Sequence, residues 1–344
     1  MVERLFRLAG ALLLLGSLLL GWVWMGYQSF ADQPLHVGES AKIFEVPAGA
    51  SLSEVAQQLQ AQGLTDHPRY LVWMGRLHGL AHAIQAGEYR IEPGTKPREL
   101  LEQMAAGRVL EHSLTLVEGW NFREVMAAVE ADPYLTHSLR GLTDSEIMSR
   151  LGWPDEKPEG RFLPETYHFP RGTSDVEFLQ RAYRAMSREL AGAWADRAQG
   201  LPLNSPYEAL ILASIIEKET ALPEERRSIA GVFVRRLEKR MRLQTDPTVI
   251  YGLGPKFDGN LRRRDLKRDT PYNTYMHRGL PPTPIAMPGR DSLVAALHPE
   301  GGDALYFVSR GDGSHHFSAT LEEHNRAVIK YQLNGHPRSF SSNP

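Results

Sequence analysis

The sequence SPYEALILASIIEKETALP, residues 205–223, has a nearly continuous apolar run that ends directly at Glu217. Ser205 and Glu208 have the spacing of a capping box, and Pro206 follows the cap, where a helix does not need the missing N–H. These signals predict a helix that is largely buried and carries a carboxyl group near its end. A carboxyl group shielded from water resists ionisation, so it can keep a proton to donate.

Two acids, Glu217 and Glu219, lie near the end of this predicted helix. At about 100° per residue each of them falls between apolar neighbours, so helical periodicity does not choose between them. The ordinary alternative is that an acid here is paired with a nearby arginine, Arg226 or Arg227, and serves the structure only.

Polar loops follow the helix. A second helix is predicted over 223–240, with Ile229 and Phe233 on its inner face. The loop LQTDPTVIYG (243–252) and the loop PYNTY (271–275) come next. Their amides, hydroxyls and carboxyl groups can hydrogen-bond sugar hydroxyls and amides, so both loops are candidate binding segments.

The N-terminal segment LAGALLLLGSLLLGWVWMGY (8–27) carries no charge and is about as long as a helix that crosses roughly 30 Å of hydrocarbon. Arg4 and Arg7 precede it and no base lies just after it, so the positive-inside rule places residues 1–7 in the cytoplasm. We therefore expect one transmembrane helix, with nearly all of the chain outside the cytoplasm.

A short polar spacer is expected over 28–40, next to the membrane. It also contains Ser29-Phe30-Ala31, which has the small-x-small pattern of a signal-peptide cleavage site. The uncharged segment is longer than the roughly 7–15 residues of a signal peptide's apolar core, so the sequence favours a retained anchor over a cleaved signal.

Composition excludes several function classes. The 344-residue chain has no cysteine, so disulfides, thiolate catalysis and cysteine metal sites are excluded. Its formal net charge of -2 gives no indication of nucleic-acid binding. The basic stretch RRRDLKR (262–268) is local, and either a solvated helix face or a contact with an acidic partner or substrate explains it.

A strand, a glycine turn and an amphipathic helix follow one another twice within 41–112. The copies begin with FEVPAG (44–49) and YRIEPG (89–94), and a weaker third copy begins with LTLVEG (114–119). Unequal spacing argues against a solenoid. The region 41–112 resembles the LysM-like modules that bind N-acetyl sugars in cell walls, with a βααβ order. A spacer without a ligand is the alternative.

From about residue 113 to Gly200 the chain alternates short strands and helices, and we expect residues 113–335 to form a mixed α+β catalytic domain. The expected fold class of the whole chain is therefore α+β, with a single N-terminal transmembrane helix, a small LysM-like module and this larger domain. The proline-containing tail, 336–344, is expected to be disordered.

Several ordered motifs resemble the MltG (YceG-like) endolytic murein transglycosylases. They are ASIIEKET (213–220), MRLQTDPTVIYG (241–252), YNTY (272–275), GLPP (279–282), HP (298–299), YFV (306–308) and HF (316–317). Together with the N-terminal anchor they extend the resemblance over nearly the whole chain beyond the spacer. Long motifs in the same order make it specific.

The resemblance implies that Glu217, the first glutamate of EKET, is the catalytic acid. It implies cleavage of the β-1,4 bond between N-acetylmuramic acid and N-acetylglucosamine inside peptidoglycan strands, leaving a 1,6-anhydro end. Ordinary glycosidases use two carboxyl groups. Here the N-acetyl group and the C6 hydroxyl of the substrate supply the second function, and one glutamate acts first as acid and then as base.

The same resemblance implies a bacterial inner-membrane protein with a periplasmic catalytic domain and no cofactor. Nascent glycan strands are the expected substrate, and class A penicillin-binding proteins are the expected partners.

Residues of the two polar loops are expected to bind the substrate. The polar members of this set would contact sugar amides and hydroxyls, and the tyrosines would pack on the faces of the sugars. The residues are Gln244, Thr245, Asp246, Asn273, Tyr251, Tyr272 and Tyr275. Structural roles are the alternative. Asp246-Pro247 is also a helix-start signal, and tyrosines can belong to a core once their hydroxyls are hydrogen-bonded.

Two other functions compete with this interpretation. A metal hydrolase would draw its ligands from His298, His315, His316 and His324, but the sequence has no His-Glu-x-x-His motif, and no metal is expected. A non-catalytic scaffold that binds glycan and peptidoglycan synthases is the second alternative.

Overall fold

The structure is a computed structural model that describes residues 2–333. It confirms the mixed α+β class and divides into two compact units. Unit 1 contains Met1–His112 and His168–Gly172; unit 2 contains Ser113–Tyr167 and Thr173–Pro344. The predicted tail, 336–344, lies outside the described residues.

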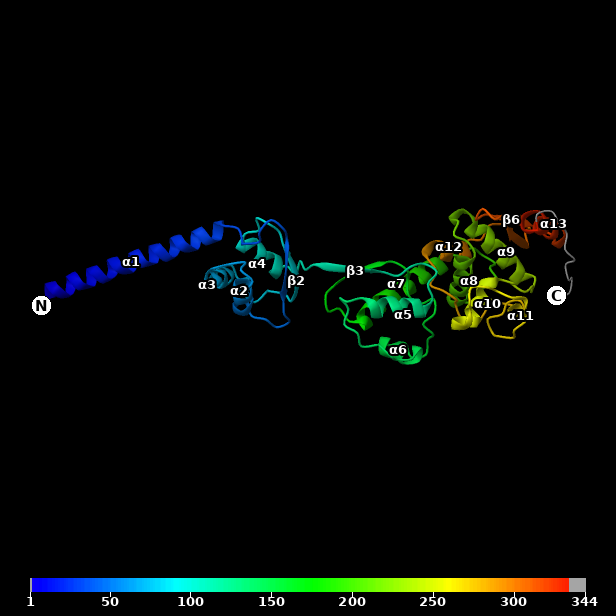
Figure 1. Ribbon diagram of the computed structural model, residues 1–344, viewed down its shortest axis with the longest axis horizontal. Coiled ribbons are helices and arrows are strands. Elements are labelled where there is room, and N and C mark those ends of the chain that lie inside the picture. Colours follow the sequence, from blue (N-terminus) through cyan, green and yellow to red (C-terminus); the bar gives the residue numbers. More distant parts are fainter. Residues whose placement is uncertain (1, 334–344) are drawn as a thin grey trace. The chain divides into compact units, whose positions relative to one another are not determined.

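Helix α1, Val2–Asp32, contains the predicted transmembrane segment (Figure 1). Its span Phe6–Asp32 has a mean hydropathy of 2.0, and its most apolar window is not buried in the protein. Length and composition therefore allow it to cross a membrane, as they also allow a signal sequence. The helix continues beyond residue 27 because Tyr27 and Phe30 are buried in the apolar core of unit 1.

Unit 1 continues in the order β1-α2-α3-β2-α4. Strand β1 (Lys42–Val46) pairs antiparallel with β2 (Gly87–Ile91), so that Lys42 lies opposite Ile91. The helices are α2 (Leu52–Ala61), α3 (Pro68–Leu77) and α4 (Pro97–Ala105). The βααβ order is thus present, while the likeness to LysM modules stays a prediction. Leu35 and Val37 of the expected spacer are buried in this core.

The predicted strand, turn and helix units form as expected. The turn glycines Gly49, Gly94 and Gly119 have positive φ values of 77°, 88° and 78°, which a side chain would disfavour. A reciprocal cap follows the first turn, where Ser51 and Glu54 bond each other's backbone N–H at 3.3 and 2.7 Å.

Unit 2 contains the remaining helices and most of the remaining strand residues. They are β3 (Glu111–Thr115), α5 (Phe122–Ala131), α6 (Asp144–Leu151), β4 (Thr166–Pro170), α7 (Asp175–Ala195), α8 (Pro206–Glu219), α9 (Arg226–Glu238), α10 (Asp246–Leu253), α11 (Arg263–Leu266), α12 (Arg290–Leu297), β5 (Tyr306–Ser309), β6 (His315–Ser318) and α13 (Leu321–Gln332), with short 3₁₀ turns at Pro223–Glu225 and Gly254–Lys256. Strands β3 and β4 pair, as do β5 and β6, the latter antiparallel.

Helix α8 is the centre of unit 2, and α7, α9, α10 and α12 pack around it (Figure 1). Residues 209–216 are all buried, as expected for a helix that is apolar on every side. Its one polar member, Ser214, donates to the Ile211 carbonyl at 2.7 Å and accepts from the Ile285 N–H at 3.0 Å. The helix is thereby fixed, and so are the two acids at its end.

Candidate active site

Glu217 and Glu219 lie on opposite sides of the last turn of α8. Residues two positions apart in a helix are separated by about 200° around its axis, so the carboxyl groups of Glu217 and Glu219 have different surroundings. The helix ends at Glu219, where the following Thr220 adopts an extended backbone. Helix geometry therefore creates two distinct acidic sites from one motif.

Glu217 is enclosed by hydrogen-bond donors. Its Oε2 accepts from the Gly289 N–H at 2.9 Å and the Ser292 hydroxyl at 2.7 Å, and its Oε1 lies 3.7 Å from Nη2 of Arg226. The side chains of Glu217 and Arg226 are only 7% and 10% exposed. The pairing with Arg226 that the structural alternative expected is present, and the catalytic role of Glu217 stays a prediction.

A further acid, Glu118, lies beside this pair. A Cβ added to Gly289 would overlap Oε1 of Glu118, so the Glu118 carboxyl group rests against the residue whose N–H binds Glu217. Partial burial, and then the charge of Glu217, raise the pKa of Glu118. Sequence analysis did not single out Glu118, although it directly precedes the turn glycine of the third repeat.

Glu219 has different surroundings from Glu217. It lies in the wall of a cleft of about 490 Å³ and accepts a hydrogen bond from the Thr245 hydroxyl. Burial raises its pKa to about 7, and the charge of Asp246 acts in the same direction. The Thr245 hydrogen bond and the nearby His315 and Arg236 oppose that rise. A large fraction of Glu219 is therefore protonated near neutral pH.

The cleft beside Glu219 brings together much of the predicted binding set. Gln244, Asp246 and Tyr275 line it, and the Tyr275 hydroxyl donates to Oδ1 of Asp246 at 2.6 Å. Thr245 lies behind Glu219 and is 2% exposed. Asp246 also begins α10, so the helix-start interpretation of Asp246-Pro247 is confirmed, while its binding of substrate stays a prediction.

Gln244 has a strained backbone. Its φ of 52° lies in the left-handed region, which for a non-glycine residue costs roughly 1–2 kcal/mol. Arg236 holds it there, since Nη1 donates to the Gln244 side-chain oxygen at 3.3 Å and to the Leu243 carbonyl at 2.9 Å. Strain of this kind is frequent at functional sites. Arg236 was not found by sequence analysis, because nothing local marks an arginine that binds distant carbonyls.

Tyr251 and Tyr272 lie at a different cavity, of about 410 Å³. The Tyr251 hydroxyl donates to Oε2 of Glu159 at 2.8 Å, and the Tyr272 hydroxyl lies 2.8 Å from Oγ1 of Thr283. Burial raises the pKa of Glu159 to about 7, which the Tyr251 hydrogen bond partly offsets. The predicted binding set is thus divided between two cavities.

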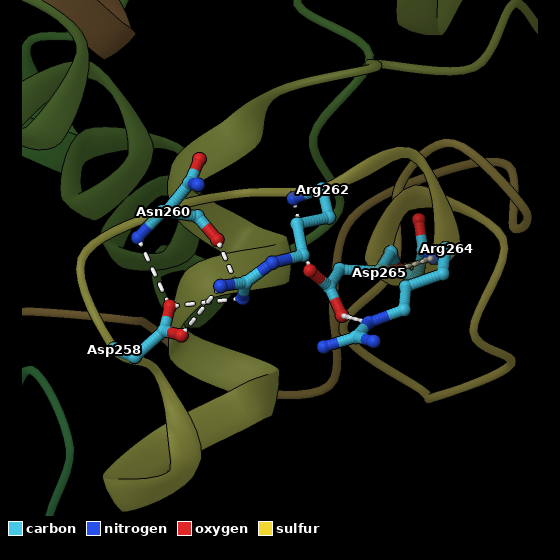
Figure 2. Close-up of polar contacts among 6 residues, drawn as sticks. Asp258, Asn260, Arg262, Arg264 and Asp265 are labelled. Carbon is cyan, nitrogen blue, oxygen red and sulfur yellow. Dashed lines mark hydrogen bonds and ion pairs between the residues drawn. The ribbon is translucent and has the colours of Figure 1, made fainter.

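Asn273 is fully buried and ties the loop after α10 together. Its amide donates to the carbonyls of Leu266 at 3.0 Å and Arg268 at 2.7 Å, which favours a structural role. In the same loop Asp258 binds both Nη atoms of Arg262 at 3.0 and 2.7 Å (Figure 2). The other bases of the 262–268 stretch are exposed, as on a solvated surface.

The four histidines considered as metal ligands have separate partners. His298 lies 3.4 Å from Asp196 and His315 lies 2.7 Å from Glu225, while the rings of His316 and His324 contact Tyr331 and Tyr306. Within residues 2–333, no group of three or more His, Cys, Asp or Glu side chains has an arrangement suited to a metal ion.

The fold and the site together define a class: an α+β protein with a membrane-compatible N-terminal helix and a protonatable carboxyl group in a polar cleft. Comparison with known proteins is more specific. The model of the YceG-like family matches residues 44–330, which is most of the chain. The chain therefore belongs to the YceG-like family.

Named relatives are similar to most of this chain. An endolytic murein transglycosylase of Bacillus subtilis is 31% identical over 303 residues, 83% of each protein. One of Streptococcus pneumoniae is 26% identical over an alignment of 354 residues, 90% of this chain and 62% of its own length. A crystal structure of a yceG-like protein from Listeria monocytogenes has 29% identity and a TM-score of 0.54, covering 84% of this chain and 99% of its own.

Proposed function

We propose that this chain is a membrane-anchored endolytic lytic transglycosylase of peptidoglycan. It cleaves the β-1,4 bond between N-acetylmuramic acid and N-acetylglucosamine inside glycan strands and leaves 1,6-anhydro ends. Support comes from family membership, from the names of the relatives, and from a cleft with a protonatable acid among polar side chains.

The proposed catalytic acid is Glu217, the first glutamate of the EKET motif in a chain that belongs to the YceG-like family. Its carboxyl group is held by the Gly289 N–H, the Ser292 hydroxyl and Arg226. The alternative acid is Glu219, which lines the polar cleft and has its pKa raised to about 7 by burial. Family membership is the observation that carries the proposed function.

The reaction then proceeds in two steps. Glu217 first protonates the glycosidic oxygen as the bond to the anomeric carbon breaks, while the N-acetyl carbonyl of the muramoyl unit stabilises the positive charge. The C6 hydroxyl next attacks the anomeric carbon and gives its proton to the ionised Glu217, which closes the anhydro ring and restores the acid. Gln244, Asp246 and Tyr275 orient the sugar in the cleft. Exclusion of water favours ring closure over hydrolysis.

The proposal extends to the setting of the enzyme. Helix α1 anchors it in the bacterial inner membrane with the N-terminus in the cytoplasm, so that unit 2 works in the periplasm on nascent strands. The βααβ module of unit 1 binds glycan, and class A penicillin-binding proteins are partners at the site of synthesis.

Mass spectrometry of peptidoglycan digested by the detergent-solubilised full chain tests the function. Anhydro-ended products from the wild type, absent with a folded Glu217→Gln variant and present with Glu219→Gln, would support the proposal in full. Loss of activity in a folded Glu219→Gln variant alone would transfer the role of the acid to Glu219. Reducing ends would mean a hydrolase. No cleavage by a folded wild type that still binds glycan would favour the scaffold.

A further inference from the structure

The turn after β3 lies against Glu217, the proposed acid. A Cβ added to Gly119 in this turn would be 3.9 Å from Cγ of Glu217. The Gly119 N–H donates to the Met287 carbonyl at 2.9 Å, and the Gly119 carbonyl accepts from Nζ of Lys218 at 3.1 Å. These bonds join the turn both to the end of α8 and to the segment before α12. The turn therefore holds its other residue, Glu118, at the candidate active site.

The carboxyl groups of Glu118 and Glu217 both contact Gly289. Oε1 of Glu118 lies where a side chain at Gly289 would begin, and the Gly289 N–H donates to Oε2 of Glu217. Oε1 of Glu217 lies 3.7 Å from Nη2 of Arg226 and accepts no hydrogen bond within the described part of the chain. This oxygen is the one left for the substrate. A sugar whose glycosidic oxygen reaches it also lies beside Glu118.

The Glu118 carboxyl group has no donor of its own in the protein. Within residues 2–333 no hydrogen bond and no ion pair reaches it, and part of the side chain faces solvent. Its pKa is raised by partial burial and by the charge of Glu217, and the charge of Arg226 opposes that rise. A carboxyl group placed beside another acid without a donor disfavours the folded state. Its position therefore suits a ligand better than it suits stability.

The proposed reaction contains a donor that matches this acceptor. The acetamido carbonyl oxygen of the muramoyl unit bonds to the anomeric carbon as the glycosidic bond breaks, and positive charge then develops at the acetamido N–H. A hydrogen bond to a charged group is roughly twice as strong as a neutral one. An acceptor for this N–H therefore gains strength as the transition state forms, and such a gain raises kcat.

We propose that the Glu118 carboxylate accepts the acetamido N–H of the muramoyl unit and so positions it for attack, an inference that rests on the proposed transglycosylase function. Glu217 protonates the glycosidic oxygen as its bond to the anomeric carbon breaks, and the acetamido carbonyl oxygen bonds to that carbon. The N–H keeps its proton and stays bonded to Glu118. O6 then displaces the carbonyl oxygen and gives its proton to Glu217, which remains the only acid and base.

A muramoyl thiazoline tests this role, because sulfur replaces the acetamido oxygen in a ring already closed on the anomeric carbon. Its ring nitrogen, once protonated, donates as the acetamido N–H does. Titration calorimetry of the full chain in detergent should show about 10-fold weaker thiazoline binding by Glu118→Gln, and at least as large a loss with Glu118→Ala. In the anhydro-end assay on peptide-free glycan strands, Glu118→Gln should lower kcat about 10–100-fold and change KM less than about 3-fold.

Asp291→Asn is the matched control. Asp291 also acts on Glu118 as a like charge, but its side chain is 77% exposed and lies 3.5 Å from Arg226. Its loss should leave thiazoline affinity and kcat within about 2-fold of the wild type. The Glu118 variants should keep the wild-type circular dichroism spectrum, because the substituted side chain makes no hydrogen bond in the described chain.

The inference on Glu118 fails while the transglycosylase stands if the wild type forms anhydro ends but does not bind the thiazoline, or binds it no better than Glu118→Gln does. It also fails if Asp291→Asn weakens thiazoline binding as much as Glu118→Gln, since the effect is then one of charge alone. A wild type that forms no anhydro ends refutes the proposed function, and this inference with it.

Discussion

The two acids of α8 should respond to the same substitution with opposite changes in stability. Glu219 has its pKa raised from an ordinary 4.5 to about 7, chiefly by burial. The folded protein therefore binds more protons than the unfolded chain between these values, and its stability falls as the pH rises through this window. Below about pH 4.5 both states are protonated and the effect vanishes.

Glu219→Gln removes this dependence. A rise from 4.5 to about 7 corresponds to on the order of 3 kcal/mol, since each pKa unit is worth about 1.4 kcal/mol. The amide oxygen of glutamine can still accept the Thr245 hydrogen bond. We therefore expect the variant to be about 1–3 kcal/mol more stable than the wild type at pH 8, with the difference shrinking toward zero near pH 4.5.

Glu217→Gln should lower the stability of the folded protein. The substitution removes the carboxylate beside the Arg226 guanidinium, whose side chain is 10% exposed, and Asp291 at 3.5 Å is the carboxylate that remains near it. Removing one partner of a largely buried pair typically costs about 3–5 kcal/mol, and the remaining Asp291 reduces this to roughly 2–3 kcal/mol.

Urea unfolding of the full chain in detergent, followed by tryptophan fluorescence at pH 5 and pH 8, measures both effects. A Glu219→Gln variant that is no more stable than the wild type at pH 8 would contradict the argument. So would a gain in stability that is equal at both pH values, because only a titrating carboxyl group makes the gain depend on pH.

Three further outcomes follow from the packing of unit 2. Gly231→Ala should destabilise the protein by about 1–3 kcal/mol in thermal unfolding, because the new Cβ would lie 2.4 Å from the Glu300 backbone carbonyl oxygen. Gly192→Ala is the control: its new Cβ would have no atom within 4 Å, so this variant should be about 0.5–1 kcal/mol more stable. Arg236→Ala should lose roughly 3 kcal/mol and raise KM in the glycan assay, because it leaves the buried Leu243 carbonyl and the partly buried Leu305 carbonyl without this donor. Tyr251→Phe should destabilise by about 1–2 kcal/mol, and more at pH 8 than at pH 5, since its hydroxyl stabilises the charged form of Glu159; equal losses at both pH values would refute that reason.

Local sequence patterns are sufficient for the elements of this fold. The apolar run of α8, its Ser205 cap and the three glycine turns each depend on neighbours in the chain, so the sequence predicts them. The uncharged N-terminal segment likewise predicts a membrane-compatible helix. The position where that helix ends, Asp32, could not be predicted from the segment, because it depends on the packing of aromatic side chains against the rest of unit 1.

The sequence by itself determined the family, the α+β class and the motif that carries the acids. Only the tertiary structure decided the surroundings of those acids, because a helix places Glu217 and Glu219 on opposite sides and residues distant in the sequence supply their partners. Arg226 and the first turn of α12 contact Glu217, while Thr245 contacts Glu219, which lines the cleft. Desolvation and charge act through space, so the chemistry of each carboxyl group was decided by residues far away in the sequence.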